Sequence, residues 1–267
     1  MSKTELTLEA VDAVKGIAVE AGKRILDIYQ KDFDIYEKND ASPLTEADLA
    51  AHNCILDGLK QLSSLPILSE ESADISWEER KTWSKYWLVD PLDGTKEFIK
   101  KNGEFTVNIA LIEYGEPVFG VVHAPALGKT YVGWVNKLAY VEQEGKQTPL
   151  QPSINDGSET WRVVGSRSHQ SPEINKVLAQ LGGTAELVAM GSSLKLCCVA
   201  DGTAHLYPRV GPTSEWDTGA AHAVVLAAGG KVTELDLDNP LNPDASPLKY
   251  NQKASVLNPY FMVTNKL

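Results

Sequence analysis

Apolar side chains recur at helical spacing in two stretches near the start of the chain. The first covers residues 5–30, and its apolar positions are Leu8, Val11, Val14, Ala18, Ala21, Ile25 and Ile28. The second covers residues 45–62 and follows a Ser-Pro step, and its inward positions are Leu49, Ile55, Leu56, Leu59 and Leu62. Because this spacing places them on one side of an α-helix, we expect two amphipathic helices.

The pattern changes to that of strands in the next part of the chain. Apolar runs cover 105–112, 118–123, 130–135 and 139–142, and Gly115 marks the first turn between them. Connections as short as these join neighbouring antiparallel strands. We therefore expect an antiparallel meander in the first half of the chain.

Strand-like and helix-like segments alternate in the second half, which predicts α/β layers. The expected strands are 161–164, 186–190, 204–207 and 231–235, and the expected helices are 172–181, 192–200 and 217–228. Residues 145–160 are polar and contain several Gly and Pro residues. We expect a seam there between two halves, at 1–150 and 151–267.

Composition narrows the class of protein. The chain has 267 residues and a formal net charge of −11, which argues against binding nucleic acid or an anionic membrane through bulk electrostatics. Its three cysteines, Cys54 and the adjacent Cys197 and Cys198, make neither a disulfide framework nor a zinc spacing. Without a signal peptide or a membrane-spanning run, we expect a cytoplasmic protein. Peripheral attachment to the inner membrane and the oligomeric state stay open.

The most informative stretch is 87–99, Trp-Leu-Val-Asp-Pro-Leu-Asp-Gly-Thr-Lys-Glu-Phe-Ile. Pro91 and Gly94 are expected to end the strand, so that Asp90 and Asp93 stand at its C-terminal end. Two carboxylates ~4 Å apart repel each other by roughly 1 to 4 kcal/mol unless a cation neutralises them. Hard oxygen ligands without His or Cys favour Mg²⁺ over zinc. The alternative is an ordinary solvated turn, which also uses Asp and Gly.

Two other places supply further acids. Glu70 and Glu71 end a short apolar run, and Asp217 opens an apolar helical segment. Together with Asp90 and Asp93 they provide enough carboxylate for a two-metal site. Taken alone, Asp217 would also be explained by the helix macrodipole, which favours an acid in the first turn.

An acidic pair, then Asp-Pro-Leu-Asp-Gly-Thr, then a late Trp-Asp together resemble the inositol monophosphatase superfamily of metal-dependent, lithium-sensitive phosphatases. The resemblance implies an α/β fold, the αβαβα layered sandwich, with the active site between an N-terminal half that carries most metal ligands and a C-terminal half. It also implies two or three Mg²⁺ ions held by Glu70, Asp90, the Leu92 carbonyl, Asp93 and Asp217. Ser69 and Gly219 depart from the Gly and Ala that are usual at these places.

Asp48 and Thr95 form a second group of candidates. Residues 45–48, Thr-Glu-Ala-Asp, make a capping-box pattern, so Asp48 has an ordinary role at the start of its helix. The resemblance implies in addition that Asp48 pairs with Thr95 to orient and deprotonate the attacking water, beside Glu70. The two roles are compatible, because a helix start is a rigid place to hold a carboxylate.

Candidates for substrate binding surround the metal ligands. Three strand-end loops, at 165–169, 191–195 and 207–213, offer hydroxyls, N–H groups or cations that suit an anion. An ordinary helix N-cap explains the loop at 191–195 equally well. The full set is Glu70, Leu92, Asp93, Gly94, Thr95, Ser166, Arg167, Gly191, Ser192, Ser193, Lys195, Tyr207, Arg209 and Asp217.

These blocks look like the bacterial 3′(2′),5′-bisphosphate nucleotidase branch of the superfamily. The resemblance implies a small-molecule nucleotide substrate, adenosine 3′,5′-bisphosphate, which would be hydrolysed to AMP and phosphate. An inositol monophosphatase or a broad sugar phosphatase would share the metal site, but would not need an aromatic surface for adenine at Tyr207. A non-catalytic nucleotide sensor would not need the water-activating pair. His123, Cys197 and Cys198 fall in apolar segments, and we interpret them as core residues.

Overall fold

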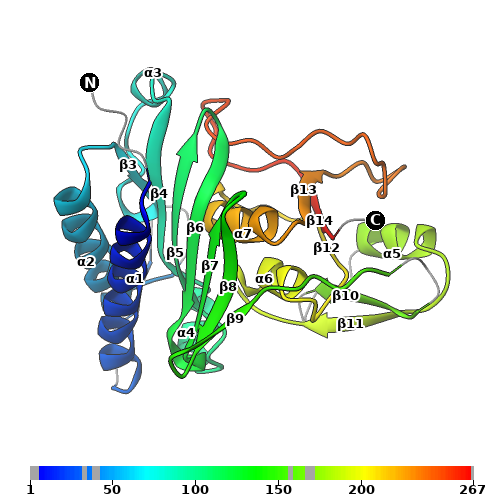
Figure 1. Cartoon of the computed structure of the whole chain (residues 1–267), viewed down its shortest axis with the longest axis horizontal. Helices are drawn as coiled ribbons and strands as arrows, with labels where there is room; N and C mark the ends of the chain where they lie inside the picture. The colour runs from blue at the N-terminus through cyan, green and yellow to red at the C-terminus, as the bar shows by residue number, and fades with distance from the viewer. Residues whose placement is uncertain (1–5, 32–34, 38–42, 156–158, 166–171, 266–267) are drawn as a thin grey trace.

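The computed structural model describes residues 6–31, 35–37, 43–155, 159–165 and 172–265. Its helices and sheets form five successive layers: a helix pair, a large sheet, a second helix pair, a smaller sheet and a last helix (Figure 1). This order of layers confirms the predicted αβαβα sandwich. One apolar core lies between the first helices and the large sheet, and a second fills the space between the two sheets.

The first layer consists of α1 (Leu8–Tyr29) and α2 (Glu46–Leu62), both close to their predicted bounds. Their buried positions follow the predicted spacing, with two exceptions. Leu8 is 60% exposed and Leu49 is 44% exposed. Leu8 is the first residue of α1, ahead of the buried stripe, which starts at Val11. Leu49 points away from the buried face because that face passes through Ala47 and Ala51, two residues to either side.

The large sheet has seven strands in chain order, and all neighbours are antiparallel except the parallel pair β3–β4. The strands are β3 (Ile67–Ser69), β4 (Lys85–Asp93), β5 (Thr106–Glu113), β6 (Glu116–Ala124), β7 (Lys129–Trp134), β8 (Leu138–Gln143) and β9 (Lys146–Pro149). The predicted meander is confirmed. β9 lies in the segment that we expected to be a seam. Its four side chains are exposed at the sheet edge, so no apolar alternation marks the strand.

β4 also differs from the prediction that Pro91 would end the strand. It continues to Asp93, and its register with β5 shifts between Asp90 and Asp93. A bulge of this kind lets the chain stay in the sheet while it re-aims the side chains next to it. The two acids are therefore carried on an irregular strand end rather than beyond it.

The smaller sheet has the strand order β11-β10-β12-β14-β13. Its strands are β10 (Trp161–Gly165), β11 (Ala185–Ala189), β12 (Leu206–Arg209), β13 (Lys231–Glu234) and β14 (Phe261–Thr264). Helices α6 (Leu194–Ala200) and α7 (Glu215–Ala227) lie between the sheets, and α5 (Pro172–Gln180) covers the outer face (Figure 1). β14 was not predicted. Its four residues are all buried, and so short a run shows no periodicity.

Shorter elements complete the chain. They are β1 (Ile35–Glu37), β2 (Pro43–Thr45), α3 (Trp77–Arg80), α4 (Thr95–Ile99) and 3₁₀ turns at Glu70–Ser72 and Pro125–Leu127. The large sheet ends at Pro149 and the smaller one begins at Trp161, yet α7 of the second half packs on the large sheet. The division into 1–150 and 151–267 therefore stays a prediction.

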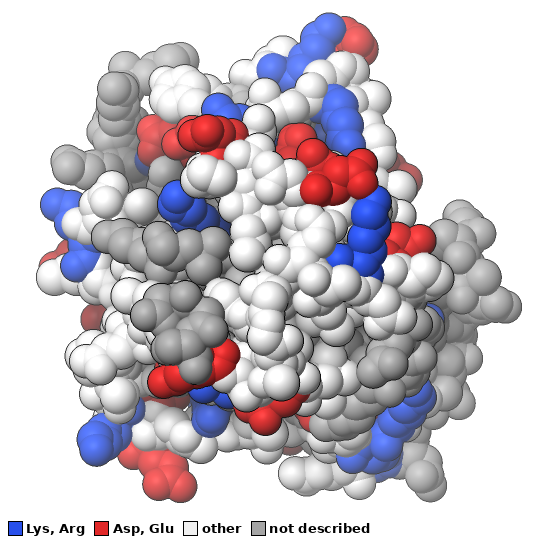
Figure 2. Space-filling view, turned by 90° about the vertical axis from the view of Figure 1, so that its right-hand side faces the viewer, with Lys and Arg blue, Asp and Glu red and all other residues white. Residues whose placement is uncertain are grey.

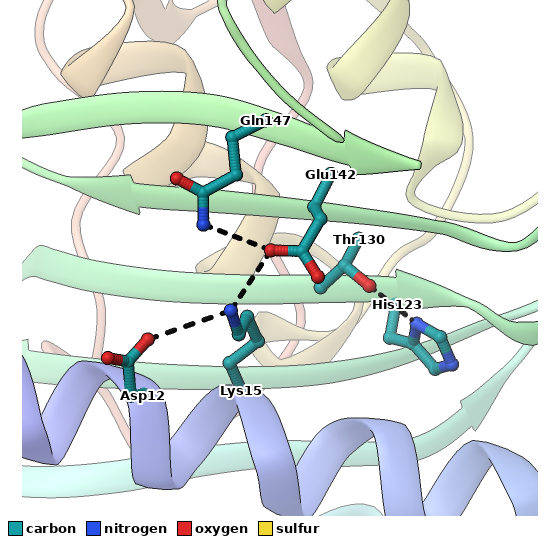
Figure 3. Close-up of polar contacts among 6 residues, drawn as sticks. All are labelled: Asp12, Lys15, His123, Thr130, Glu142 and Gln147. Atoms are coloured by element: carbon teal, nitrogen blue, oxygen red, sulfur yellow. Dashed lines mark hydrogen bonds and ion pairs between the residues drawn. The ribbon is translucent and has the colours of Figure 1, made fainter. Parts of the chain in front are cut away.

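Polar contacts join α1 to the far strands of the large sheet (Figure 3). Lys15 Nζ lies 3.0 Å from Glu142 Oε2 and 3.6 Å from Asp12, and Gln147 donates to the same Glu142 oxygen at 3.0 Å. His123 Nδ1 lies 2.9 Å from Thr130 Oγ1 in the buried part of this interface.

The residues expected in the core are found there. His123, Cys197 and Cys198 are buried, as predicted, and all three cysteines are free thiols. None of the helices in the described part of the chain has the length and apolar character needed to cross a bilayer. On the face with α5, blue cationic and red acidic residues are interspersed (Figure 2). A polyanion laid on that face would meet carboxylates as well as cations.

Candidate active site

The turn between β4 and α4 carries the central motif. The Asp90 side chain is 1% exposed, and its Oδ1 accepts a hydrogen bond of 3.0 Å from the Leu92 N–H. Gly94 has φ +91°, a left-handed conformation that strongly favours glycine, and it is the N-cap of α4. A hydrogen bond within the turn and the left-handed glycine therefore define its shape without an ion or a substrate.

Asp48 and Thr95 come from different elements and meet beside this turn. Thr95 Oγ1 lies 3.4 Å from Asp48 Oδ1 and 3.4 Å from the Leu92 carbonyl oxygen. The other Asp48 oxygen accepts from Thr45 N at 2.8 Å and from Thr45 Oγ1 at 2.6 Å, which completes the capping box of α2. The cap orients the buried carboxylate, and one oxygen remains directed at Thr95.

Glu70 lies at the end of β3, in the 3₁₀ turn that follows. The pKa of Asp90 is raised well above its usual range by burial, and the negative charges of Glu70, Asp93 and Asp217 raise it further. These four acids therefore interact through space, although they come from three separate parts of the chain. Ser69, just before Glu70, is fixed by a 2.9 Å contact of its Oγ with His52 Nδ1.

Asp217 occupies the first turn of α7. Its Oδ2 accepts a 2.9 Å hydrogen bond from Ser214 N in a second capping box. Burial raises the pKa of Asp217 to about 8, and the nearby Asp93 charge adds to the rise, whereas Arg209 opposes it. The Arg209 guanidinium is held by the carbonyls of Gly211 and Pro212, at 3.1 and 2.7 Å.

The loop at 191–195 closes over Asp93. The Ser193 N–H donates to Asp93 Oδ2, so the anion that this N–H binds here is the protein's own carboxylate. Burial raises the pKa of Asp93 to about 6, while Lys195 opposes the rise. A Cβ at Gly191 would lie 2.9 Å from Glu104 O, so only glycine permits this approach. Ser192 takes φ +46°, a strained conformation for a serine.

A small cavity of about 80 Å³ lies where Asp93, at the end of β4, meets residues from the later part of the chain. Its wall includes Asp93, Ser192, Ser193, Lys195, Tyr207, Arg209 and Asp217. The Tyr207 side chain is 3% exposed and packs edge-on against Phe261, with Lys195 Nζ 6.0 Å from its ring centre. Tyr207 therefore does not offer the open aromatic face that we expected for adenine, because both neighbours cover the ring.

The structure brings together most of the predicted site, with one gap. Ser166 and Arg167 lie outside the described residues. Two polar residues that the sequence did not indicate, Thr106 and Asn108, hold Ser193 through contacts of 2.8 Å each to its Oγ. Both are on β5 and alternate with apolar neighbours, so they read as the ordinary polar positions of a strand.

The chemistry of the acids fits a hard divalent cation. Burial and mutual repulsion hold three carboxyl pKa values above their usual range, and a bound cation would relieve both. In the described part of the chain, no three His, Cys, Asp or Glu side chains are close enough together to hold a metal as they stand. The exact ligand set therefore stays a prediction.

Comparison with known proteins identifies the family. A model of the inositol monophosphatase family matches residues 7–261. The chain belongs to the inositol monophosphatase family. It is 47% identical to the 3′(2′),5′-bisphosphate nucleotidase CysQ of Escherichia coli K12 over 257 residues, which cover 95% of this chain and 99% of that protein. It is 34% identical to the protein of the same name from Haemophilus influenzae, over 92% of this chain and 89% of that one.

Solved structures agree with this placement. The crystal structure of CysQ from Bacteroides thetaiotaomicron has 40% sequence identity and a TM-score of 0.81, over 97% of this chain and 98% of that one. Inositol monophosphatase from Anabaena shares the fold at 23% identity, with a TM-score of 0.71. The predicted family and its bisphosphate nucleotidase branch are thus both confirmed.

Proposed function

We propose that this chain is a 3′(2′),5′-bisphosphate nucleotidase that hydrolyses the 3′-phosphate of adenosine 3′,5′-bisphosphate, giving AMP and phosphate. The similarity to nucleotidases over almost the whole chain supports the activity. The single structural observation that carries the proposal is the cavity in which Asp93 of one half meets Asp217, Lys195 and Arg209 of the other. Mutually repelling carboxylates beside two cations suit a metal-bound phosphate.

Each residue has a distinct role in this proposal. Asp90, Asp93, Asp217 and Glu70, with the Leu92 carbonyl, would hold Mg²⁺, two or three ions in all. When bound, Mg²⁺ supplies a water of lowered pKa and neutralises the charge of the phosphate. The Thr95 hydroxyl would donate a hydrogen bond to Asp48 Oδ1, 3.4 Å away, which leaves the Thr95 oxygen able to accept from the attacking water and to orient it. As the water attacks, its proton would pass to Thr95 while the Thr95 proton passes to Asp48.

The residues of the second half bind and orient the substrate. Lys195 and Arg209 would give the phosphates positive charge, and Ser192 and Ser193, which follow Gly191, form part of the cavity wall beside Asp93. The leaving 3′-oxygen departs on the side of Asp217. Ser166 and Arg167 remain proposed contacts, and the cytoplasmic location and peripheral attachment to the inner membrane remain predictions.

Phosphate release tests the proposal directly. Purified protein with Mg²⁺ is given adenosine 3′,5′-bisphosphate or inositol 1-phosphate, each with and without lithium. We expect strong turnover of the nucleotide that lithium blocks. Preference for inositol 1-phosphate would contradict the proposed substrate, and nucleotide binding without turnover of either compound would point to a sensor.

Variants separate the proposed roles. We expect Asp93→Asn to lower kcat at least about 100-fold, because it removes a charged ligand that would hold Mg²⁺ and so misplaces the phosphate. Asp57→Asn, on the exposed side of α2, should keep full activity. Thr95→Ala should also lose most activity and Thr95→Ser should regain most of it, because serine keeps the hydroxyl. Normal Mg²⁺-dependent turnover by Asp93→Asn would contradict the metal assignment.

A further inference from the structure

A large cavity lies away from the candidate active site. It has a volume of about 1030 Å³ and shares no lining residue with the small cavity around Asp93. Its walls come from the large sheet, the C-terminal part of α7 and β13, and its apolar surface includes Val118, Trp134, Leu226, Val232 and Leu248. Small-molecule sites in proteins typically measure about 300–1,000 Å³ and are mostly apolar.

The charges around this cavity do not cancel. Its two carboxylates are already paired, Glu113 with Lys85 at 3.6 Å and Glu116 with Lys249 at 3.5 Å. Two further lysines line the cavity, Lys137 and Lys231, and neither forms an ion pair with another described residue. In a chain with a net charge of −11, this excess of positive charge favours an anionic ligand.

One side chain in the wall of the cavity has a ring nitrogen that makes no hydrogen bond to a described residue. His222 lines the wall, its side chain is 2% exposed, and its Nδ1 lies 2.9 Å from Tyr250 Oη. Burial lowers the pKa of His222 to about 3, so the imidazole is neutral. Its Nε2 makes no hydrogen bond to any residue that the structure describes.

The surrounding hydrogen bonds decide what His222 Nε2 can bind. Tyr250 donates its hydroxyl proton to Thr218 Oγ1 at 3.1 Å, and Thr218 in turn donates to the Glu215 carbonyl at 3.1 Å. Tyr250 must therefore accept from His222, which places the ring proton on Nδ1. Nε2 is left as an acceptor, so a ligand has to bring an N–H or O–H to it.

From these observations we infer that the cavity is a second small-molecule site. Its ligand is an anionic compound with an apolar ring system, which places its acidic group near Lys137 and Lys231 and donates a hydrogen bond to His222 Nε2. Trp134, whose ring centre lies 6.0 Å from Lys137 Nζ, provides an aromatic wall beside the acidic group.

The site also has a physical connection to the candidate active site. The hydrogen bonds from His222 through Tyr250 to Thr218 end in the first turn of α7, next to Asp217. α7 therefore carries the cavity at one end and a proposed metal ligand at the other.

A fluorescent probe of the right chemistry tests the site. 8-Anilinonaphthalene-1-sulfonate has a ring system, an N–H and a sulfonate, and its emission rises in apolar surroundings. We expect one saturable site per folded chain. The double variant Lys137→Gln/Lys231→Gln should raise the Kd at least about fivefold through the loss of two cations. The control Lys60→Gln/Lys146→Gln, exposed lysines elsewhere with the same change of net charge, should leave it unchanged.

Ala245→Trp provides an independent test, because residue 245 lines the cavity and a large side chain there would fill it. We expect this variant to lose probe binding and to keep its phosphatase activity and near-UV circular dichroism. Naphthalene-1-sulfonate, which lacks the N–H, should bind more weakly, as measured by calorimetry. Equal probe binding by all variants, or displacement of the probe by adenosine 3′,5′-bisphosphate, would overturn the inference.

Discussion

The two faces of the large sheet are covered by helices in different ways. On one face, α1 and α2 pack through apolar side chains against Val107, Ile109 and similar residues. On the other, the backbone of α7 lies directly on two glycines of the sheet. A Cβ at Gly120 would lie 2.2 Å from Ala220 O, and a Cβ at Gly133 would lie 2.5 Å from Val224 Cα.

This difference suggests different roles for the two helix layers: one mainly supports the sheet, and the other positions a site residue. Side chains between a helix and a sheet can repack when one of them changes, whereas backbone in contact with backbone cannot. α7 carries Asp217. Because the backbone of α7 is in close contact with Gly120 and Gly133, the position of that carboxylate relative to Asp90 and Asp93 is fixed. The helix pair on the other face mainly stabilises the sheet, with Asp48 at the start of α2 as the exception.

The largest effect is expected from Gly120→Ala. The added methyl group would push α7 off the sheet, costing about 1–3 kcal/mol of unfolding free energy, and the displaced Asp217 should lower kcat about 100-fold. Urea unfolding and phosphate release measure the two. Gly16→Ala on α1, where nothing lies within 4 Å of the new methyl group, should instead be neutral or slightly stabilising. Full activity of Gly120→Ala would contradict the positioning role of α7.

Low pH should lower the free energy of unfolding through His123, which is buried between α1 and the large sheet. Burial lowers the pKa of His123 from 6.5 to about 4, so below pH 6.5 the unfolded chain takes up a proton that the folded chain refuses. Stability is therefore complete above pH 6.5 and is lost as the pH falls towards 4, by on the order of 3 kcal/mol. His123→Gln should lose less stability than the wild type between pH 7 and pH 4.5. If the unfolding free energies of the two proteins fell in parallel with pH, His123 would be excluded as a source of the acid sensitivity.

A smaller change on the α2 side should affect stability alone. Ile55 is fully buried against the large sheet, and Ile55→Val should cost about 0.5–1.5 kcal/mol of unfolding free energy. Phosphatase activity per folded molecule should stay the same, because this interface can adjust through its side chains. A matching loss of kcat would show that α2 also positions the site.

The smallest effect is expected at the polar contact in Figure 3. Lys15 and Glu142 are 19% and 27% exposed, and a partly exposed ion pair contributes about 0–1 kcal/mol. Lys15→Met should therefore change the midpoint of urea unfolding only slightly, and less in 1 M salt. A double-mutant cycle with Glu142→Gln isolates the pair. A coupling energy much above this range would show that the contact is a main link between α1 and the sheet edge.

Sequence patterns predicted the elements with strong periodicity and missed those without it. α1, α2 and the meander have long apolar repeats, so their bounds differ from the prediction by only a few residues. β9 is polar on all sides, and β14 is buried on all sides, so neither alternates. The apolar character of Leu49 predicts an inward position, although the helical period of its neighbours puts it outside.

In the candidate site, too, some features could be predicted from the sequence and others could not. The spacing of Asp90, Asp93, Gly94 and Thr95 by itself determined a tight turn with acids at a strand end, because Gly at positive φ and the local hydrogen bonds act over only a few residues. Two further places in the sequence supplied Glu70 and Asp217 as candidate acids, and the family resemblance gave them and Asp48 their roles. Only the tertiary structure decided that Ser193 N–H binds Asp93 and that Tyr207 is covered by Phe261 and Lys195. Such contacts join residues about 12 to 100 positions apart, and no local pattern encodes them.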